Sequence, residues 1–416
     1  MTDLTERRKY RVLMIAACPF PANYGTSGCI KEMCEVMGDR GHEIHVLTYP
    51  YGDGSPVRSV TLHRVPHLGW SREIAVGPTL QRPLFDLLMV FKAIHLAWKY
   101  KCEIIHTHNY EGQLIGICAK VLTWRPLLYN AINTMADELL SYNAIKPVFI
   151  AKGLARFLDW FAPRISDHIL TLTSDLKDIL VSWGLPKDHI TVVPAGVQLE
   201  MFSNADPLRF RKIWNLGSSR TVLYAGTIDQ FQRVDILIDA FSRLGPECAD
   251  VLLLIVFPFA RRERKEELAA QAQKLGIADR VRFVDEHPLE DLPDCLALAD
   301  VAVVPRPQCP GHPIKLLNYM AAGRPIVVSA GGAKGIRHLE NGFIFPDHDA
   351  AGLAQGITTL LHDRELSARL GTAARQTILE EYDWRILAQK IEGIYAGMLA
   401  KKTPWYARGY KRQTAV

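Results

Sequence analysis

The chain has 416 residues, of which 48% are hydrophobic and 22% are charged, and this balance excludes a disordered chain. Its length exceeds what one ordinary hydrophobic core serves, so we expect two domains. The formal charge of +5 is modest for such a chain and argues against a dedicated nucleic-acid binder, although it is compatible with an anionic small ligand or a weak membrane-surface contact.

The cysteines and the N-terminus favour a cytoplasmic protein. The eight cysteines are scattered without a CxxC pair, which argues against a zinc site or a disulfide framework and favours a reducing compartment. The first ten residues, MTDLTERRKY, lack the apolar region of a signal peptide, and no apolar run reaches the roughly 18 residues of a membrane-spanning helix. Contact with the inner face of the membrane stays open.

The first half of the chain predicts a doubly wound α/β domain. An apolar strand at 11–17 leads through a Pro/Gly-rich loop at 18–28 into a helix at 30–40 and a second strand at 43–48. This order begins a βαβ unit with a parallel sheet. Further buried strands are expected at 104–106, 127–129, 169–172 and 190–193.

The second half begins in the same way, with a strand at 220–225, a loop at 226–232 and an amphipathic helix at 234–244. Later strands are expected at 251–257, 281–284, 301–304 and 325–329. We therefore predict an α/β protein with two Rossmann-like doubly wound domains. The predicted parts are an N-terminal domain at 1–196, a linker at 197–208, a C-terminal domain at 209–383, a closing helix at 384–400 and a basic aromatic tail at 401–416.

Two segments leave alternatives open. The closing helix either ends the second domain or returns to the first, and the tail is either a frayed, solvated end or an anionic membrane contact. The amphipathic stretch at 146–165 mixes cations with aromatic residues. It predicts either a helix whose apolar face packs on the core or a helix at a membrane interface.

The segment at 311–328, GHPIKLLNYMAAGRPIVV, carries the strongest chemical signal. Pro313 suits the first turn of a helix, where its missing N–H is not needed. The free N–H groups near Ile314 and Lys315 then form an anion site of the kind that holds a diphosphate. Asn318 lies one turn further along the same face. The alternative is an ordinary packed helix between two strands.

This segment is similar to the donor-site helix of glycosyltransferase family 4, whose usual text is E-x7-E followed by M-A-x-G-x-P-V-V. Further blocks resemble the family in the same order along the chain, at 104–112, 172–202 and 382–399. The resemblance implies the GT-B architecture, with two Rossmann-like domains facing across a cleft. It also implies retaining transfer from a nucleoside-diphosphate sugar to a glycan or a lipid-linked sugar. We expect no catalytic metal, because no cluster of carboxylates or histidines has ligand spacing.

The chain departs from the family at its charged donor residues. Pro310 and Asn318 stand where the family has its two glutamates, so the amide of Asn318 is expected to hold the ribose hydroxyls. The family's basic pair after the first strand of the second domain is replaced at Thr227 and Gln232, so Arg233 or Lys315 must supply the positive charge. The predicted donor-binding residues are Gly25, Gly28, Thr227, Gln232, Arg233, Glu286, Ile314, Lys315 and Asn318.

The first domain supplies the predicted catalytic residue. His108 ends a strand at its carboxyl end, where ligands of open α/β sheets bind. The resemblance implies that it faces the donor sugar, and a structural hydrogen-bonding role is the alternative. We expect His106 to point the opposite way, into packing. Asn130 and Asn133, which follow the next strand, either bind the acceptor or cap a helix.

The loop at 21–28 resembles the family's glycine-rich loop, and Gly25 and Gly28 let the backbone approach a ligand closely. A plain tight turn is the alternative. Two other functions also stay open: a nucleotide-sugar epimerase or phosphorylase, and a non-catalytic partner subunit, for which Pro310 and Thr227 are the evidence. We expect no cofactor, because the nucleotide sugar is a substrate. A dehydrogenase is disfavoured because neither half shows a dinucleotide fingerprint.

Overall fold

The computed structural model describes residues 8–21, 25–52, 56–67, 82–135, 148–257, 262–285, 291–307 and 314–401. The chain forms two compact units. The first unit comprises the chain up to Gly196 and from Trp384 onward, and the second unit comprises residues 197–383. The segment at 197–208, predicted as a linker, belongs to the second unit and contains the 3-10 helix η2 (Leu199–Phe202).

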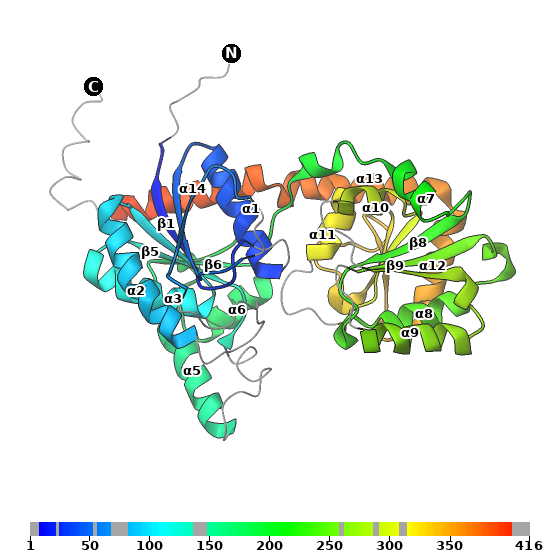
Figure 1. The fold of residues 1–416 in the computed structure, drawn as a ribbon, viewed down its shortest axis with the longest axis horizontal. Helices are drawn as coiled ribbons and strands as arrows, with labels where there is room; N and C mark the ends of the chain where they lie inside the picture. The colour runs from blue at the N-terminus through cyan, green and yellow to red at the C-terminus, as the bar shows by residue number, and fades with distance from the viewer. Residues whose placement is uncertain are drawn as a thin grey trace, which may run out of the picture. The chain divides into compact units, whose positions relative to one another are not determined.

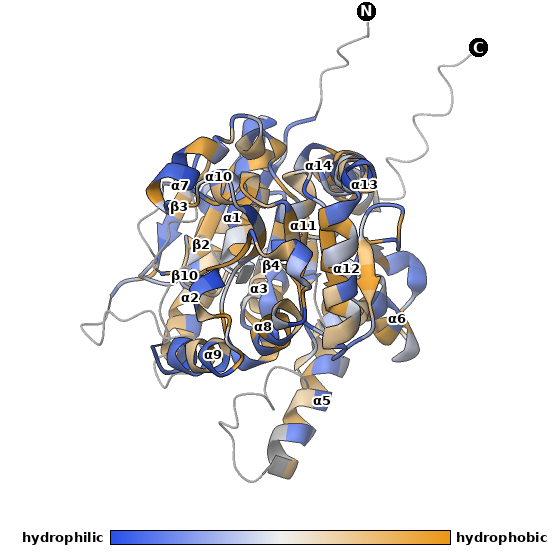
Figure 2. Ribbon diagram, turned by 90° about the vertical axis from the view of Figure 1, so that its right-hand side faces the viewer, coloured by the Kyte–Doolittle hydropathy of each residue, from blue (hydrophilic) through white to orange (hydrophobic). Residues whose placement is uncertain are grey.

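The first unit is built on a parallel seven-stranded sheet in the order β3-β2-β1-β4-β5-β6-β7 (Figure 1). Helix α5 extends away from the other helices of this unit (Figures 1 and 2). The strands are β1 (Arg11–Ala16), β2 (Glu43–Thr48), β3 (Thr61–Arg64), β4 (Ile104–His108), β5 (Leu127–Ala131), β6 (His168–Thr171) and β7 (Ile190–Val192). The helices are α1 (Gly25–Asp39), α2 (Arg82–Lys99), α3 (Asn109–Thr123), α5 (Val148–Ile165), α6 (Ser174–Ser182) and α14 (Trp384–Lys401).

The second unit is built on a parallel six-stranded sheet in the order β10-β9-β8-β11-β12-β13. Its strands are β8 (Arg220–Ala225), β9 (Val251–Val256), β10 (Val281–Val284), β11 (Val301–Val304), β12 (Ile326–Ser329) and β13 (Phe343–Phe345). Its helices are α7 (Pro207–Ile213), α8 (Val234–Ser242), α9 (Arg262–Lys274), α10 (Leu292–Ala297), α11 (Ile314–Ala321), α12 (Ala350–His362) and α13 (Arg364–Thr377).

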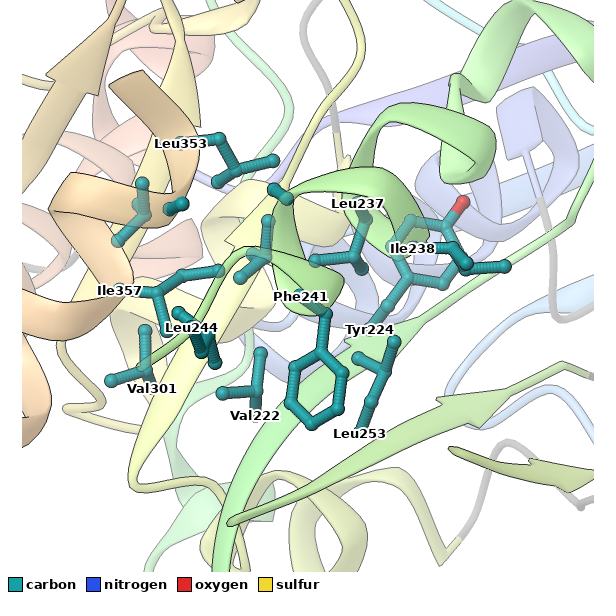
Figure 3. Close-up of a cluster of buried hydrophobic side chains, with 14 of the residues drawn as sticks. Val222, Tyr224, Leu237, Ile238, Phe241, Leu244, Leu253, Val301, Leu353 and Ile357 are labelled. Carbon is teal, nitrogen blue, oxygen red and sulfur yellow. The ribbon is translucent and has the colours of Figure 1, made fainter. Parts of the chain in front are cut away.

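Both sheets are buried on two faces, as parallel sheets require. In β1, Val12 and Met14 belong to the core under α1 and α14, whereas Leu13 and Ile15 belong to the core under α2 and α3. In the second unit, side chains of β8, β9 and β11 meet Phe241 of α8 and the apolar face of α12 (Figure 3). Successive strand residues therefore serve opposite cores.

The predicted α/β class is confirmed, and each predicted strand is present. The short strands β3 and β13 were not predicted, because neither carries a run of buried residues: β3 is the edge strand TLHR, with an exposed and half-buried pattern. The start of α1 was also predicted wrongly. The helix begins at Gly25, not after Gly28, and the Ser27 hydroxyl donates to the Pro19 carbonyl at 2.9 Å.

Helix α14 is held to the rest of the first unit by polar contacts. The Trp384 indole donates to Glu32 at 2.8 Å, and its ring covers Gly196, where a Cβ atom would lie 2.5 Å away. Arg40 donates two hydrogen bonds to the Glu392 carboxylate, at 2.7 and 2.8 Å, and the His42 Nε2 lies 2.9 Å from it. Burial raises the pKa of Glu392, but hydrogen bonds from Arg40 and His42 outweigh burial and leave it below its ordinary value.

We expect Glu392→Gln to lower the free energy of unfolding at pH 7 by about 2–3 kcal/mol, because Arg40 then loses its charged acceptor. A depressed carboxyl pKa stabilises the fold above the unfolded value of 4.5, and this stabilisation is lost as the pH falls through the folded pKa. In urea unfolding, the free energies of unfolding of the wild type and of Glu392→Gln should therefore converge as the pH falls below the folded pKa of Glu392. The exposed control Asp178→Asn should change stability by less than about 0.5 kcal/mol. If the difference in free energy of unfolding between the wild type and Glu392→Gln is equally large in acid, the charge of Glu392 does not stabilise the fold.

Candidate functional site

The candidate site in the second unit begins at the N-terminus of α11. The first N–H groups of a helix have no partner within the helix and carry its positive partial charge. The first turn of α11 contains no acidic residue that would offset this charge. Ile314, Lys315 and Asn318 are half-buried on one face, whereas Leu316, Leu317 and their neighbours are buried in the core. The predicted anion site therefore has a helix terminus facing outward from the core.

Lys315 joins this helix terminus to the end of β8. Its ammonium donates to the Tyr224 hydroxyl and to the Gln232 side-chain carbonyl, both at 2.7 Å, and lies 4.4 Å from the centroid of the Tyr224 ring. The Gln232 amide in turn donates to Thr227 at 3.5 Å. Three of the predicted donor-binding side chains, those of Thr227, Gln232 and Lys315, are thus brought together.

Gly226 leaves room for the Lys315 side chain beside the end of β8. It has φ of +148°, and a Cβ atom at this position would lie 2.8 Å from the Lys315 Nζ. The Tyr224 hydroxyl donates to the Thr227 carbonyl at 2.5 Å, which fixes the turn after the glycine. Burial raises the pKa of Tyr224 well above its ordinary value, so the hydroxyl keeps the proton that it donates.

The side chain of Arg233 binds residues outside the group formed by Thr227, Gln232 and Lys315. Its guanidinium forms an ion pair with Asp235 at 3.0 Å and contacts the His348 Nδ1 at 2.6 Å. Asp235 and His348 hold the Arg233 guanidinium, whereas Lys315 lies in the first turn of α11 itself. Of the two predicted cations, Lys315 is therefore the better source of positive charge at the α11 terminus.

Asn318 lies one turn into α11, and its side chain makes no hydrogen bond with any described residue. Its amide is half-buried, with both donor and acceptor groups available to a ligand hydroxyl. Glu286 and Pro310 lie outside the described residues. The ribose contact of Asn318 and the donor contact of Glu286 remain predictions.

In the first unit, His108 and Asn130 form a buried polar pair at the carboxyl ends of β4 and β5. They are register partners, and the Asn130 amide donates to the His108 Nδ1 at 3.2 Å. The His108 Nε2 and the Asn130 Oδ1 are buried without a hydrogen-bond partner in the described structure. Burial lowers the pKa of His108 to about 3, so the ring is neutral and Nε2 carries its proton. This pair therefore holds one buried donor and one buried acceptor without a described partner.

We predicted that His106 points away from His108, and this prediction is wrong. The two rings lie on the same face of β4 and stack with centroids 4.6 Å apart, because residues two apart on a strand share a face. His106 Nδ1 lies 2.8 Å from the hydroxyl of Tyr395 on α14, which gives this histidine a structural contact.

The remaining predicted residues of the first unit lie near these strand ends. Gly25 and Gly28 lie in the first turns of α1, which follows β1. Asn133 is half-buried just after β5. Asp159 of α5 accepts from the N–H of Met135 at 2.8 Å and so ties the segment after β5 to α5. The acceptor-binding role of Asn130 and Asn133 stays a prediction.

Sequence reasoning missed Tyr224 and Arg306. Tyr224 is the second-last residue of β8, directly before the glycine turn. Arg306 follows β11, and its guanidinium carbon lies 4.9 Å from the centroid of the exposed Phe231 ring. A polar residue at the end of a buried strand was the available signal, and it is the same signal that singled out His108.

One cluster with metal-ligand chemistry lies away from this site. Glu247, Cys248 and His362 bring ligand atoms within 4.8 Å of one another at the amino-terminal edge of the second sheet. Arg220 donates to the Glu247 carbonyl at 3.0 Å, and its positive charge opposes a bound cation. This cluster is therefore not part of the candidate site.

Two family models match the chain. Residues 25–201 match the model of Glycosyltransferase Family 4, and residues 208–377 match that of Glycosyl transferases group 1. The D-inositol 3-phosphate glycosyltransferase of Thermobispora bispora is 24% identical over 95% of this chain and 96% of its own length. The phosphatidyl-myo-inositol mannosyltransferase of Mycobacterium leprae is 26% identical over 92% of this chain and 96% of its own length.

The solved structures agree on the fold. The structure of Anabaena Alr3699/HepE in complex with UDP has a TM-score of 0.74 and 18% identity, covering 93% of this chain and 100% of that chain. The fold and the site together define a glycosyltransferase of the GT-B class. Within that class, the chain belongs to glycosyltransferase family 4. Among the described residues, no helix has the length and apolarity needed to cross a membrane.

We expect Lys315→Ala to weaken binding of nucleoside diphosphates by about 10–100-fold, because a cation beside the α11 terminus contributes mainly to phosphate affinity. Binding of the nucleoside alone should change far less. Titration calorimetry with both ligands measures the difference, and Lys274→Ala on the exposed face of α9 is the matched control. Equal losses for both ligands contradict the phosphate role.

We expect His108→Ala to lower turnover by about a hundredfold while nucleoside-diphosphate affinity stays nearly intact, since it removes a preorganised donor. Removing this fully buried ring leaves a cavity and an unpaired Asn130 amide, so stability should fall by about 2–4 kcal/mol and turnover is compared per folded molecule. His42→Ala is the control: this buried histidine contacts Glu392 and the N–H of Tyr10, so its loss should lower the melting temperature but preserve turnover per folded molecule. If the turnover of His108→Ala falls only in proportion to its folded fraction, His108 has a structural role.

Proposed function

We propose that this glycosyltransferase moves a sugar from a nucleoside-diphosphate sugar to an acceptor, with retention of configuration and without a metal ion. One observation carries the proposal: the Lys315 ammonium lies beside the N-terminus of α11, at the carboxyl ends of the central strands of the second sheet. Membership of glycosyltransferase family 4 supports the retaining outcome.

Sugar transfer requires stabilisation of the diphosphate leaving group. As the bond between the sugar and the diphosphate breaks, negative charge grows on the diphosphate, and fixed N–H dipoles and a cation stabilise it without reorganising. Tyr224 and Gln232 fix the Lys315 ammonium in advance. In this proposal Asn318 holds the ribose, and the His108 Nε2–H and the Asn130 carbonyl bind hydroxyls of the sugar or the acceptor.

A glycan or a lipid-linked sugar is the proposed acceptor, and the inner face of the membrane is the proposed location. The exposed residues of α5 support a peripheral membrane contact. Phe149, Phe157 and Trp160 are 73%, 53% and 54% exposed, so they do not pack on the core as the simpler sequence interpretation required. Arg164 lies 5.1 Å from the centroid of the Trp160 ring, which pairs a cation with an aromatic side chain on the surface.

A panel of nucleotide sugars tests the proposal. The wild-type chain should be stabilised by one of the UDP, GDP, ADP or dTDP sugars, by about 2.7 kcal/mol at 100 times its dissociation constant. Product analysis with that donor then tests transfer to sugar acceptors. Epimerised nucleotide sugar or free sugar phosphate identifies the alternative activities. The absence of stabilisation by every donor identifies a non-catalytic subunit and overturns the proposal.

A further inference from the structure

Helices α2 and α3 of the first unit pack side by side (Figure 1). Both carry exposed apolar residues. On α2, the exposed side chains at positions 84, 87, 91 and 98 fall on one stripe, because their spacing follows the helical period. Phe91 is 65% exposed and Trp98 is 55% exposed. The other face of α2, with Phe85, Met89 and Ala93, is buried in the core.

The end of α3 continues this surface. Val121 and Leu122 are 61% and 58% exposed, and Trp124, directly after the helix, is 80% exposed. The guanidinium carbon of Arg125 lies 5.6 Å from the centroid of the Trp98 ring. The ends of the two helices therefore meet at two exposed tryptophans with a cation beside them. We call this the α2–α3 face: Leu84, Leu87, Phe91, Trp98, Val121, Leu122 and Trp124.

The exposed charges on the helices of this region have one sign. Among the described residues of α2, α3 and α5, the exposed charged side chains are all basic: Lys99, Lys152, Arg156 and Arg164. The acidic residues of these helices are used internally. Asp86 accepts from Tyr49 at 2.7 Å, Glu111 pairs with Arg82 at 3.5 Å, and Asp159 is buried. Such a surface is complementary to an anionic partner.

The tryptophans indicate which anionic partner. In the described part of the chain, the exposed tryptophans are Trp98, Trp124 and Trp160, and all three lie on or next to α2, α3 and α5. Tryptophan favours the headgroup level of a bilayer, where its ring is apolar and its N–H reaches water. The exposed large apolar residues of the second unit, such as Leu208 and Leu339, include no tryptophan among its described residues.

We propose that the α2–α3 face docks on an anionic bilayer, with Phe91, Trp98 and Trp124 at the headgroup level and Lys99 and Arg125 against lipid phosphates. The inference rests on the proposed membrane contact and extends it from α5 to a second helical surface. It does not depend on sugar transfer, because no residue of this face belongs to the candidate site.

Vesicle flotation of the full chain tests the inference. The wild type should bind vesicles of phosphatidylcholine and phosphatidylglycerol in equal amounts, bind pure phosphatidylcholine much less, and dissociate in high salt. Phe91→Ser and Trp124→Ser should each weaken binding about tenfold, the loss expected when one apolar side chain no longer enters the lipid. Trp124→Phe should retain most of the binding. Circular dichroism and nucleotide binding verify that each variant is folded.

The controls separate this face from its alternatives. Leu208→Ser and Lys274→Glu, at exposed positions of the second unit, should leave vesicle binding unchanged. Binding that depends on Phe157 and Trp160 but survives both substitutions on the α2–α3 face overturns the inference and leaves the membrane contact of α5 intact. Substitutions on this face that convert a dimer to a monomer without affecting vesicle binding assign it to self-association and also overturn the inference. Failure of the wild type to bind vesicles overturns both membrane proposals, while donor binding tests the transferase activity separately.

Discussion

Burial of both faces of each parallel sheet is the constraint on which the rest of this molecule depends. A parallel strand cannot turn directly into its neighbour, so the chain must cross over between them, usually through a helix, and these helices cover both faces. The carboxyl ends of all strands in a sheet then lie along one edge. His108, Asn130, Gly226 and Arg306 all lie at or directly after a strand end. Polar side chains are concentrated at this edge because the side chains within the strands are buried in the core.

The first unit needs α14 to complete this burial. Met14 and Leu128 belong to the same core as Leu387 and Ile391, so the last described helix closes a face whose strands come from the first half of the chain. Two polar contacts fix the register of α14 over that face: Arg40 with Glu392, and His106 with Tyr395. One consequence reaches the candidate site: His106, held by Tyr395, stacks on His108 and limits the positions open to its ring.

The sequence predicted the strands, because apolar runs bounded by glycine and proline leave few alternatives to a parallel α/β fold. It missed β3 and β13, which are short edge strands without a buried run. It also missed the start of α1, since a segment such as GTSG has no helical periodicity. Resemblance correctly identified the family. It could not predict the pairing of Arg233 with Asp235, because that depends on the side-chain geometry that follows the left-handed backbone of Arg233.

The departures from the family pattern are coherent when their charges are considered together. The family's usual text has two cations at the positions of Thr227 and Gln232 and two glutamates at those of Pro310 and Asn318. Loss of the cations alone would leave a ribose-binding carboxylate near a diphosphate that has lost its side-chain cations, and Coulomb repulsion would oppose donor binding. Here both signs are lost, and Lys315 contributes a cation that hydrogen-bonds to Gln232 itself. Gly226 leaves room for this contact, because a Cβ atom at this position would lie 2.8 Å from the Lys315 Nζ. The arrangement therefore favours a relocated anion site over a lost one.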